Sequence, residues 1–121
     1  MKISLITVTF NSDLTLRDTI QSILNQTFSD IEYIIIDGLS KDNTVDIIRK
    51  YEPQFQGRLK WISERDNGLY DAMNKGIRMS TGDIVGIINS DDFITGGILF
   101  QELQKLLKMR KRKRFMEMYV L

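Results

Sequence analysis

Hydrophobic residues along the chain gather into four short runs, each with the length and composition of a buried strand. The runs lie at residues 3–8, 31–36, 59–62 and 84–88, and polar or turn-forming residues flank each of them. Apolar runs of this length are typical of strands covered on both faces, as in a parallel sheet between layers of helices. The pattern therefore predicts four buried strands.

Between these runs, apolar residues recur at the three- and four-residue spacing that places them on one face of a helix. The apolar positions of the three predicted helices are Leu16, Ile20, Ile23 and Leu24; Val45, Ile47 and Ile48; and Leu69, Ala72, Met73, Gly76 and Ile77. Candidate caps precede each helix, namely Ser12 or Asp13, then Ser40, Asp42 or Asn43, and finally Asn67. We expect the second helix to end before Pro53 and the third before Gly82.

The alternation of strands and helices predicts the topology. It favours right-handed crossovers and a mostly parallel α/β sheet with helices on both faces. If the sheet has the doubly wound order 3-2-1-4, ligands bind where the carboxyl ends of the first and fourth strands meet. Polar residues leave the strand ends at 9–11, 37–38, 63–66 and 89–92. We therefore expect these four segments to converge on one edge of the sheet.

The composition limits the chemistry available at this edge. The 121 residues include no cysteine and no histidine, which excludes disulfides, thiolate ligands and imidazole catalysis. A metal ion must then be held by oxygen atoms, which favours Mg²⁺ or Mn²⁺ over zinc. The lack of cysteine favours a cytoplasmic protein, and 42% hydrophobic residues suffice for the core of one domain.

Two adjacent carboxylates, Asp91 and Asp92, follow the fourth predicted strand. Neighbouring carboxylates repel each other, and a divalent cation that bridges to a phosphate relieves this repulsion. The pair therefore indicates a metal site. An alternative is that one carboxylate caps the next helix while the other is solvated.

Two further acidic residues stand close to glycines at strand ends. Asp37, before Gly38, can accept hydrogen bonds from a ribose hydroxyl or a base N–H, although Asp-Gly also forms simple turns. Asp66, Asn67 and Gly68 form a second turn-like sequence, beside a helix start whose free N–H groups can bind phosphate oxygens. Both segments are consistent with turns alone as well as with nucleotide binding.

Other phosphate-binding classes fit the sequence less well. Gly96 and Gly97 are not followed by the Gly-Lys-Ser/Thr of a phosphate loop, and no Gly-x-Gly-x-x-Gly occurs, so P-loop and dinucleotide-binding functions are excluded. A phosphoacceptor domain is disfavoured because the first strand ends in Thr9, Phe10 and Asn11, without a carboxylate.

Five blocks of sequence resemble the family 2 glycosyltransferases that build bacterial polysaccharides. They are ISLITVTFN, SILNQTF, EYIIIDGLSKDNT, ERDNGLYDAMNKGI and STGDIVGIINSDD, and they cover residues 3–92 in the order and spacing of the family. The resemblance implies a GT-A fold, a Rossmann-like three-layer α/β/α domain with a mostly parallel sheet. It assigns residues 1–100 to a domain that binds a nucleotide-diphosphate sugar.

The same resemblance implies roles for single residues at the nucleotide. The stretch that contains Thr7, Thr9 and Asn11 lines the nucleotide pocket. Asp37 resembles the carboxylate that contacts the base, typically uracil. Asp66, beside Gly68, resembles a third acidic position at the nucleotide.

The resemblance also implies the metal ligands. Asp91 and Asp92 stand where the family has its D-x-D-type motif. Asp91 is expected to face the ribose or phosphate, and both aspartates are expected to hold Mn²⁺ or Mg²⁺, with Asp92 the more direct ligand.

The implied reaction is an inverting transfer of sugar, from a UDP-sugar in the first instance, to a saccharide or lipid-linked acceptor in polysaccharide biosynthesis. The metal neutralises charge on the leaving diphosphate, and a general base activates the acceptor hydroxyl. After Asp92 the sequence offers only Glu102 and Glu117 as carboxylates, so no base is assigned. The alternative is a nucleotide-sugar-binding fragment without turnover.

The last segment, residues 101–121, is expected to form a basic helix or tail. Residues 105–114 hold seven of the 17 lysines and arginines, which leaves the rest of the chain acidic. This segment does not resemble the family, whose members are usually longer, so we expect a truncated GT-A domain.

Two roles are open for the basic segment. It can be a solvated extension, or it can contact anionic lipid at the inner face of the membrane. A nucleic-acid partner is not expected, because one short basic run beside an acidic body is weak support for it. A homodimer is a further expectation if a sheet edge is left open.

Overall fold

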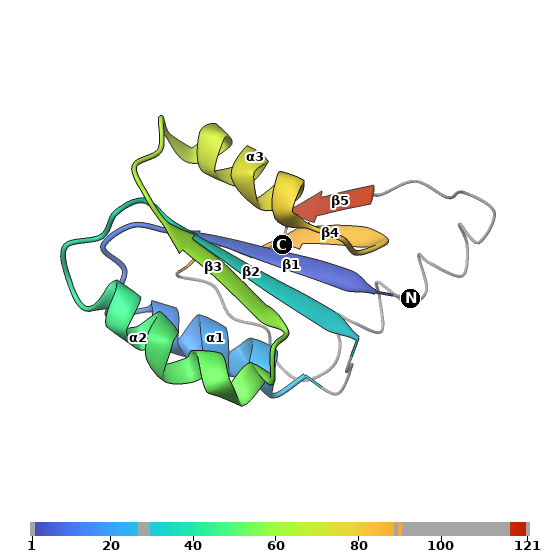
Figure 1. Ribbon diagram of the computed structural model, residues 1–121, viewed down its shortest axis with the longest axis horizontal. Helices are drawn as coiled ribbons and strands as arrows, with labels where there is room; N and C mark the ends of the chain where they lie inside the picture. The colour runs from blue at the N-terminus through green and yellow to red at the C-terminus, as the bar shows by residue number, and fades with distance from the viewer. Residues whose placement is uncertain (1, 27–29, 89, 91–116, 121) are drawn as a thin grey trace.

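The sheet contains the four predicted strands and one more. The computed structural model describes residues 2–26, 30–88, 90 and 117–120. Their elements are β1 (Ile3–Thr9), α1 (Leu16–Leu24), β2 (Ile31–Asp37), α2 (Thr44–Tyr51), the short 3-10 helix η1 (Glu52–Phe55), β3 (Leu59–Ser63), α3 (Leu69–Met79), β4 (Ile84–Ile87) and β5 (Glu117–Val120) (Figure 1).

The strand order is β3-β2-β1-β4-β5, and all neighbouring strands are parallel. The predicted order 3-2-1-4 is therefore confirmed. Thr9 at the end of β1 pairs in register with Asp37 at the end of β2, and Asp37 pairs with Ser63 at the end of β3. The carboxyl ends of these three strands are level, and the loops that follow them begin side by side.

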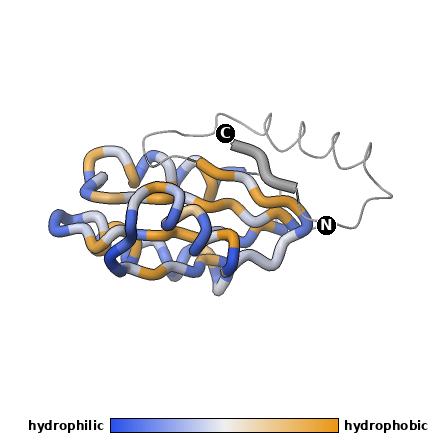
Figure 2. Tube along the Cα trace, turned by 90° about the horizontal axis from the view of Figure 1, so that it is seen from above, coloured by the Kyte–Doolittle hydropathy of each residue, from blue (hydrophilic) through white to orange (hydrophobic). Residues whose placement is uncertain are grey.

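Helices cover both faces of the sheet, which confirms the three-layer α/β/α fold. In Figure 1, α1 and α2 lie on one face and α3 lies on the other. Strand residues alternate between the two layers: Ile3 and Leu5 pack with the α1 and α2 side, whereas Ile6 packs with the α3 side. Figure 2 shows the hydrophobic stretches running along the strands. The alternation places one buried core on each face of the sheet.

Helix α3 approaches the sheet closely because it carries a glycine. A Cβ on Gly76 would lie 2.6 Å from Cγ2 of Ile6 on β1, closer than carbon atoms can pack.

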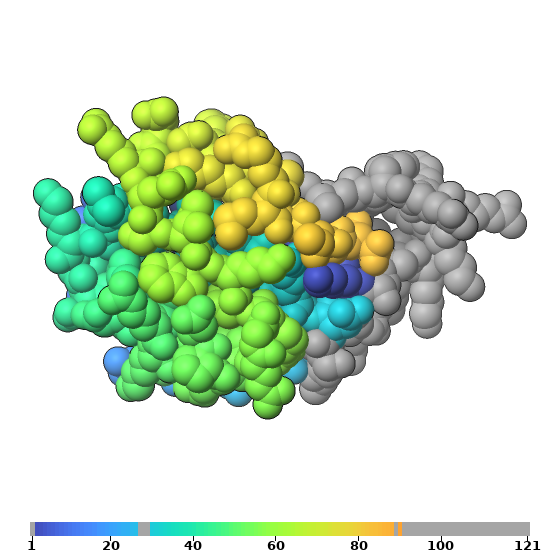
Figure 3. Space-filling model, in the orientation of Figure 1, coloured from blue at the N-terminus to red at the C-terminus, as the bar shows by residue number. Residues whose placement is uncertain are grey.

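Residues of α2, β3 and α3 form most of the surface on the face seen in Figure 3.

Two of the three predicted helix caps are wrong. Helix α1 begins after Thr15, without a side-chain cap, and α3 begins after Gly68 rather than after Asn67. The side chains of Ser12 and Asp13 make other contacts: the Ser12 hydroxyl donates to the Phe10 carbonyl, and the Asp13 carboxylate accepts from the Asn43 N–H. The prediction for α2 fits better, since Oδ1 of Asp42 accepts a hydrogen bond from the Thr44 N–H at 2.9 Å.

Residues 117–120 form a strand, whereas a basic helix or tail was predicted for this segment. They pair in parallel with β4, with Ile84 opposite Glu117 and Ile87 opposite Val120. The open edge of β4 offers backbone groups that need partners, and the terminal Met-Tyr-Val sequence favours strand formation. The basic run at 105–114 lies outside the described residues.

The amino end of the sheet holds a buried charge. The Glu32 side chain is 3% exposed and forms an ion pair with Lys60. It also accepts hydrogen bonds from the Ser4 hydroxyl at 2.6 Å and the Thr81 N–H at 2.9 Å. Burial raises the pKa of Glu32, but these donors outweigh burial and hold the pKa at about 2. This carboxylate is paired and belongs to the scaffold.

Candidate nucleotide-binding site

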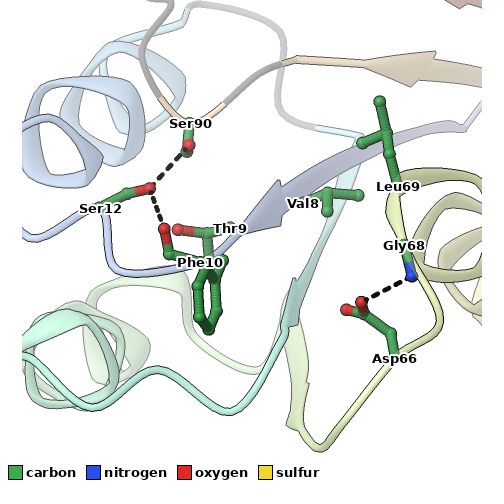
Figure 4. Close-up of a pocket in the computed structure, with 8 residues that line it drawn as sticks. All are labelled: Val8, Thr9, Phe10, Ser12, Asp66, Gly68, Leu69 and Ser90. Atoms are coloured by element: carbon green, nitrogen blue, oxygen red, sulfur yellow. Dashed lines mark hydrogen bonds between the residues drawn. The ribbon is translucent and has the colours of Figure 1, made fainter.

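A cleft of about 370 Å³ lies at the carboxyl ends of the strands. Its walls come from the end of β1, the loop before α3 and Ser90, which follows shortly after β4 (Figure 4). The lining residues are Val8, Thr9, Phe10, Ser12, Asp66, Gly68, Leu69 and Ser90. The position is the switch point between β1 and β4, where doubly wound folds bind their ligands. Its size suits a small ligand.

Thr9 lines this cleft, and its side-chain hydroxyl lacks a hydrogen-bond partner among the described residues. Thr9 is 2% exposed, and the hydroxyl is buried. A buried hydroxyl without a partner costs about 1–3 kcal/mol. The predicted site residue Thr9 therefore lines the cleft with a buried hydroxyl that lacks a partner, and its contact with a nucleotide stays a prediction.

Phe10 forms an exposed aromatic wall beside Thr9. Its side chain is 61% exposed, although large apolar side chains are normally buried. A Cβ on Gly38 would lie 3.5 Å from Cδ1 of the Phe10 ring and 2.9 Å from Oδ2 of Asp66. Gly38 therefore lets the ring and the carboxylate lie side by side. Phe10 fell within the predicted stretch but was not singled out; an aromatic residue directly after a buried strand was the available signal.

Asp37 is at the predicted strand end but is fully buried. Its carboxylate accepts hydrogen bonds from the Ser40 N–H at 2.9 Å, the Ser40 hydroxyl, and the Ser63 hydroxyl at 2.7 Å. These donors tie together the ends of β2 and β3. The contact between Asp37 and a base stays a prediction, because in this arrangement protein groups surround the carboxylate.

Thr7 lies deeper in the sheet than the cleft. It is fully buried, and its hydroxyl oxygen accepts a hydrogen bond from the Tyr33 hydroxyl at 2.7 Å. Burial raises the pKa of Tyr33, so this phenol stays protonated and keeps donating. Thr7 is therefore a core residue below Thr9, and the structure does not bring it to the cleft wall.

Asn11 links the loops after β1 and β2. Its backbone adopts a φ of 48°, its N–H donates to the Ser40 hydroxyl at 2.8 Å, and its side-chain oxygen accepts from the Lys41 N–H at 2.9 Å. The left-handed conformation is one that asparagine tolerates better than most residues. Asn11 thus fixes the rim of the site rather than lining the cleft.

The same two loops are joined further along by polar contacts. The Ser12 N–H donates to the Thr44 hydroxyl at 2.9 Å, and the Asp13 N–H donates to Asp42 at 3.2 Å. Burial raises the pKa of Asp42, but hydrogen bonds from Thr44 and Asp13 outweigh it and lower the pKa overall. The ionised carboxylate therefore helps to keep the loops in place.

Asp66 and Gly68 form the opposite wall of the cleft. Gly68 adopts a φ of 110°, which favours glycine, and its N–H donates to Oδ1 of Asp66 at 3.2 Å. Helix α3 begins directly afterwards, at Leu69. The predicted pair of site residues is thus brought together at the cleft, next to the amino end of a helix.

Ser90 marks where the chain leaves β4. Its hydroxyl donates to the Ser12 hydroxyl at 3.1 Å, and its carbonyl accepts from the Thr19 hydroxyl of α1 at 3.0 Å. The cleft wall therefore includes the residue directly before the acidic pair. Asp91 and Asp92 themselves lie outside the described residues. Within the ranges described, no group of three acidic side chains is placed to hold a metal ion.

The family of this chain is shown by a match to a family model. The model of glycosyl transferase family 2 matches residues 4–112. The chain belongs to this family. An uncharacterised glycosyltransferase of Nostoc is 38% identical over 92 residues, which cover 76% of this chain and 29% of that protein. A PGL/p-HBAD biosynthesis glycosyltransferase of Mycobacterium bovis is 37% identical over 89 residues, 74% of this chain and 35% of the relative.

Solved structures of glycosyltransferases share the fold. S. aureus TarS 1-349 in complex with UDP-GlcNAc matches with a TM-score of 0.81 at 24% identity, over 92% of this chain and 32% of that one. The mannosyltransferase PcManGT from Pyrobaculum calidifontis, in complex with GDP-Man and Mn²⁺, matches with a TM-score of 0.80 at 23% identity, over 88% and 32% of the two chains. The present chain therefore spans about a third of the length of these relatives.

Proposed function

We propose that this domain binds the donor of a glycosyltransferase, a nucleotide-diphosphate sugar, and that the sugar passes to a saccharide or lipid-linked acceptor. The observation that carries the proposal is the unpartnered Thr9 hydroxyl in a cleft at the sheet's switch point. Family membership supports the reaction class, and the cleft supports the class of ligand.

The residues around the cleft suit the parts of a nucleotide. The exposed Phe10 ring offers a face on which a base can stack. Thr9 and Asp66 offer a hydroxyl and a carboxylate for polar groups of the base or ribose. The start of α3, at Gly68 and Leu69, offers backbone N–H groups that favour phosphate oxygens.

Asp37 is proposed to contact the base after a change in the position of the Ser40 hydroxyl. A contact between the Asp37 carboxylate and a base N–H requires the Ser40 hydroxyl to turn away from Oδ1. Rotation about one side-chain bond of Ser40 provides this change and also releases the Asn11 N–H, which donates to the same hydroxyl, while Ser63 continues to hold Oδ2. UDP is the first nucleotide to test, because the corresponding aspartate of the family typically meets uracil.

The metal is proposed to be Mn²⁺ or Mg²⁺, held by Asp91 and Asp92. Carboxylate oxygens fit these ions, and the chain contains neither histidine nor cysteine to favour zinc. The anchoring of Ser90 by Thr19 and Ser12 supports a position for the pair beside the cleft. When bound, the ion supplies positive charge that stabilises the leaving diphosphate.

The names of the structural neighbours agree with this class of ligand. TarS is described with UDP and with UDP-GlcNAc, and PcManGT with GDP-Man and Mn²⁺. They differ in base and sugar, and the chemistry that they share is a nucleotide diphosphate; the Mn²⁺ ion is named for PcManGT alone. Inversion at the sugar, UDP as the nucleotide and a role in polysaccharide biosynthesis are further parts of the proposal.

A second candidate function is binding of the nucleotide sugar without transfer. Transfer needs a general base for the acceptor hydroxyl, and neither Glu102 nor Glu117, the two carboxylates after Asp92 in this sequence, is assigned that role. Release of UDP from UDP-GlcNAc and other UDP-sugars, measured with a range of saccharide acceptors, separates the two candidates. Acceptor-dependent release supports transfer, whereas tight binding with no release favours the second function.

The location of the protein is also a proposal. No helix in the described ranges is long and apolar enough to cross a membrane. The lack of cysteine supports the proposal that the domain lies in the cytoplasm, and the basic run at 105–114 is proposed to contact anionic lipid on the inner face of the membrane. Sedimentation with anionic vesicles, compared with neutral vesicles, tests this contact, and the sedimentation coefficient of the protein alone tests for a homodimer.

A further inference from the structure

Lys75 on α3 lies beneath the loop that carries Asp66. Its side chain is 15% exposed, and its ammonium group contacts two residues of the segment between β3 and α3 and one residue in the first turn of α3. It pairs with Oε1 of Glu64 at 3.1 Å, donates to the Arg65 carbonyl at 3.0 Å and lies 3.6 Å from Oδ2 of Asp71. A mostly buried lysine with three oxygen partners is more firmly held than a surface ion pair.

The contacts of Lys75 extend to the other end of the loop. The Asp71 carboxylate, which faces Lys75, also accepts a hydrogen bond from the Asn67 N–H at 2.9 Å. Lys75 thus holds the loop directly at residues 64 and 65, and through Asp71 at residue 67. Asp66 lies between these points, so its backbone is fixed on both sides.

The charge of Lys75 also suits this place. Burial lowers the pKa of Lys75, but the carboxylates of Glu64, Asp71 and Asp66 outweigh burial and leave the pKa above its ordinary value. The ammonium is therefore charged at neutral pH. It offsets the negative charge of three carboxylates close to a cleft that is proposed to receive an anionic diphosphate.

We propose that Lys75 is a positioning residue for nucleotide binding: it holds the loop at 64–68 so that the Asp66 carboxylate faces the cleft. The inference rests on the nucleotide-binding function proposed above. Lys75 is absent from the residues that line the cleft, so it acts through the loop and does not touch the nucleotide.

The chain offers a matched control in Lys60. Lys60 also forms an ion pair with a carboxylate, that of Glu32, but at the amino end of the sheet, away from the cleft. Replacement of either lysine by methionine removes an ion pair and keeps most of the apolar stem. A general loss of stability appears in both variants, whereas a loss of positioning appears only at Lys75.

The test is the dissociation constant of UDP with Mn²⁺, measured by calorimetry on the full chain. Lys75→Met is expected to weaken binding roughly tenfold, as for other residues that orient ligand-binding groups, and Lys60→Met by less than about twofold. Lys75→Arg is expected to recover most of the affinity, since it keeps the charge and the donors. Equal weakening in the two methionine variants, or no weakening at Lys75, overturns the proposal.

Amide hydrogen exchange without ligand tests the loop independently of the nucleotide. Faster exchange at Asn67 and Gly68 in Lys75→Met, with no change in Lys60→Met, supports the positioning role. Unchanged exchange at these amides contradicts it. If the wild-type chain binds no nucleotide, the proposed function fails, and the exchange measurement alone decides whether Lys75 holds the loop.

Discussion

Oδ2 of Asp66 lies 2.9 Å from the point where a Cβ on Gly38 would stand. The two residues come from loops that follow different strands, and the lack of a side chain at Gly38 lets them meet at the cleft. Gly38→Ala is therefore expected to displace the Asp66 carboxylate and weaken UDP binding by about 1 kcal/mol, roughly fivefold. Titration calorimetry of the variant measures this loss.

Gly57→Ala is the control for that substitution. A Cβ on Gly57 would meet no atom within 4 Å, although its φ of 86° strains any other residue. It is expected to lower stability and leave UDP affinity unchanged. Equal affinities for the two alanine variants and the wild type contradict a role for the contact between Gly38 and Asp66.

Thr9→Val is expected to separate binding from stability. The Thr9 hydroxyl has no partner among the described residues, so its replacement by a methyl group should leave the free energy of unfolding unchanged or slightly raised. UDP binding should fall three- to tenfold, roughly, because one hydrogen bond to the ligand is lost. Urea denaturation and calorimetry on the same sample measure both quantities.

The same substitution at Thr7 should have the reverse effect. Thr7→Val leaves the buried Tyr33 hydroxyl without its acceptor, which costs about 1–3 kcal/mol of stability. UDP affinity of the folded protein should change little. A loss of affinity at Thr7 as large as that at Thr9 argues against the assignment of Thr9 to the cleft and Thr7 to the core.

Glu32 should make stability depend on pH in the acid range. Its pKa is about 2 in the folded protein against an ordinary value of 4.5, so the unfolded chain binds the proton more tightly. The stabilisation of about 3 kcal/mol is complete above about pH 5 and disappears as the pH falls from about 4.5 towards 2. Urea denaturation between pH 7 and about 3 follows the loss.

Glu32→Gln tests which group causes that acid dependence. The variant should be less stable than the wild type at pH 7 and should lose less stability on acidification, because residue 32 no longer titrates. An unchanged pH profile assigns the acid dependence to other carboxylates.

The strands could be predicted because they depend on local pattern, whereas their order follows from the topology of doubly wound sheets. The apolar run at 31–36 and the level ends of β1 and β2 follow from hydrophobic periodicity and from the parallel topology. Strand β5 could not be predicted in this way. Its pairing with β4 is a contact between distant segments, and a strongly basic run separates the two in sequence.

The candidate site was predicted in position more accurately than in detail. Thr9, Asp66 and Gly68 meet at the cleft because they leave the strand ends or the start of α3. The burial of Asp37 depends on the hydroxyls of Ser40 and Ser63, which come together only in the folded sheet. No local pattern in the sequence predicts such a contact. The hydrogen bond from the Tyr33 hydroxyl to the Thr7 hydroxyl could not be predicted for the same reason.

Metal-dependent nucleotide binding is tested by calorimetry of UDP with the full chain, with and without Mn²⁺ and beside Asp92→Ala. Binding is expected to require the metal and to be lost in the variant, since the adjacent carboxylates are proposed to hold an ion that would offset the charge of the diphosphate. If a chain that circular dichroism shows to be folded binds neither UDP nor GDP with Mn²⁺ or Mg²⁺, the result would contradict the proposal that the domain holds a working donor site.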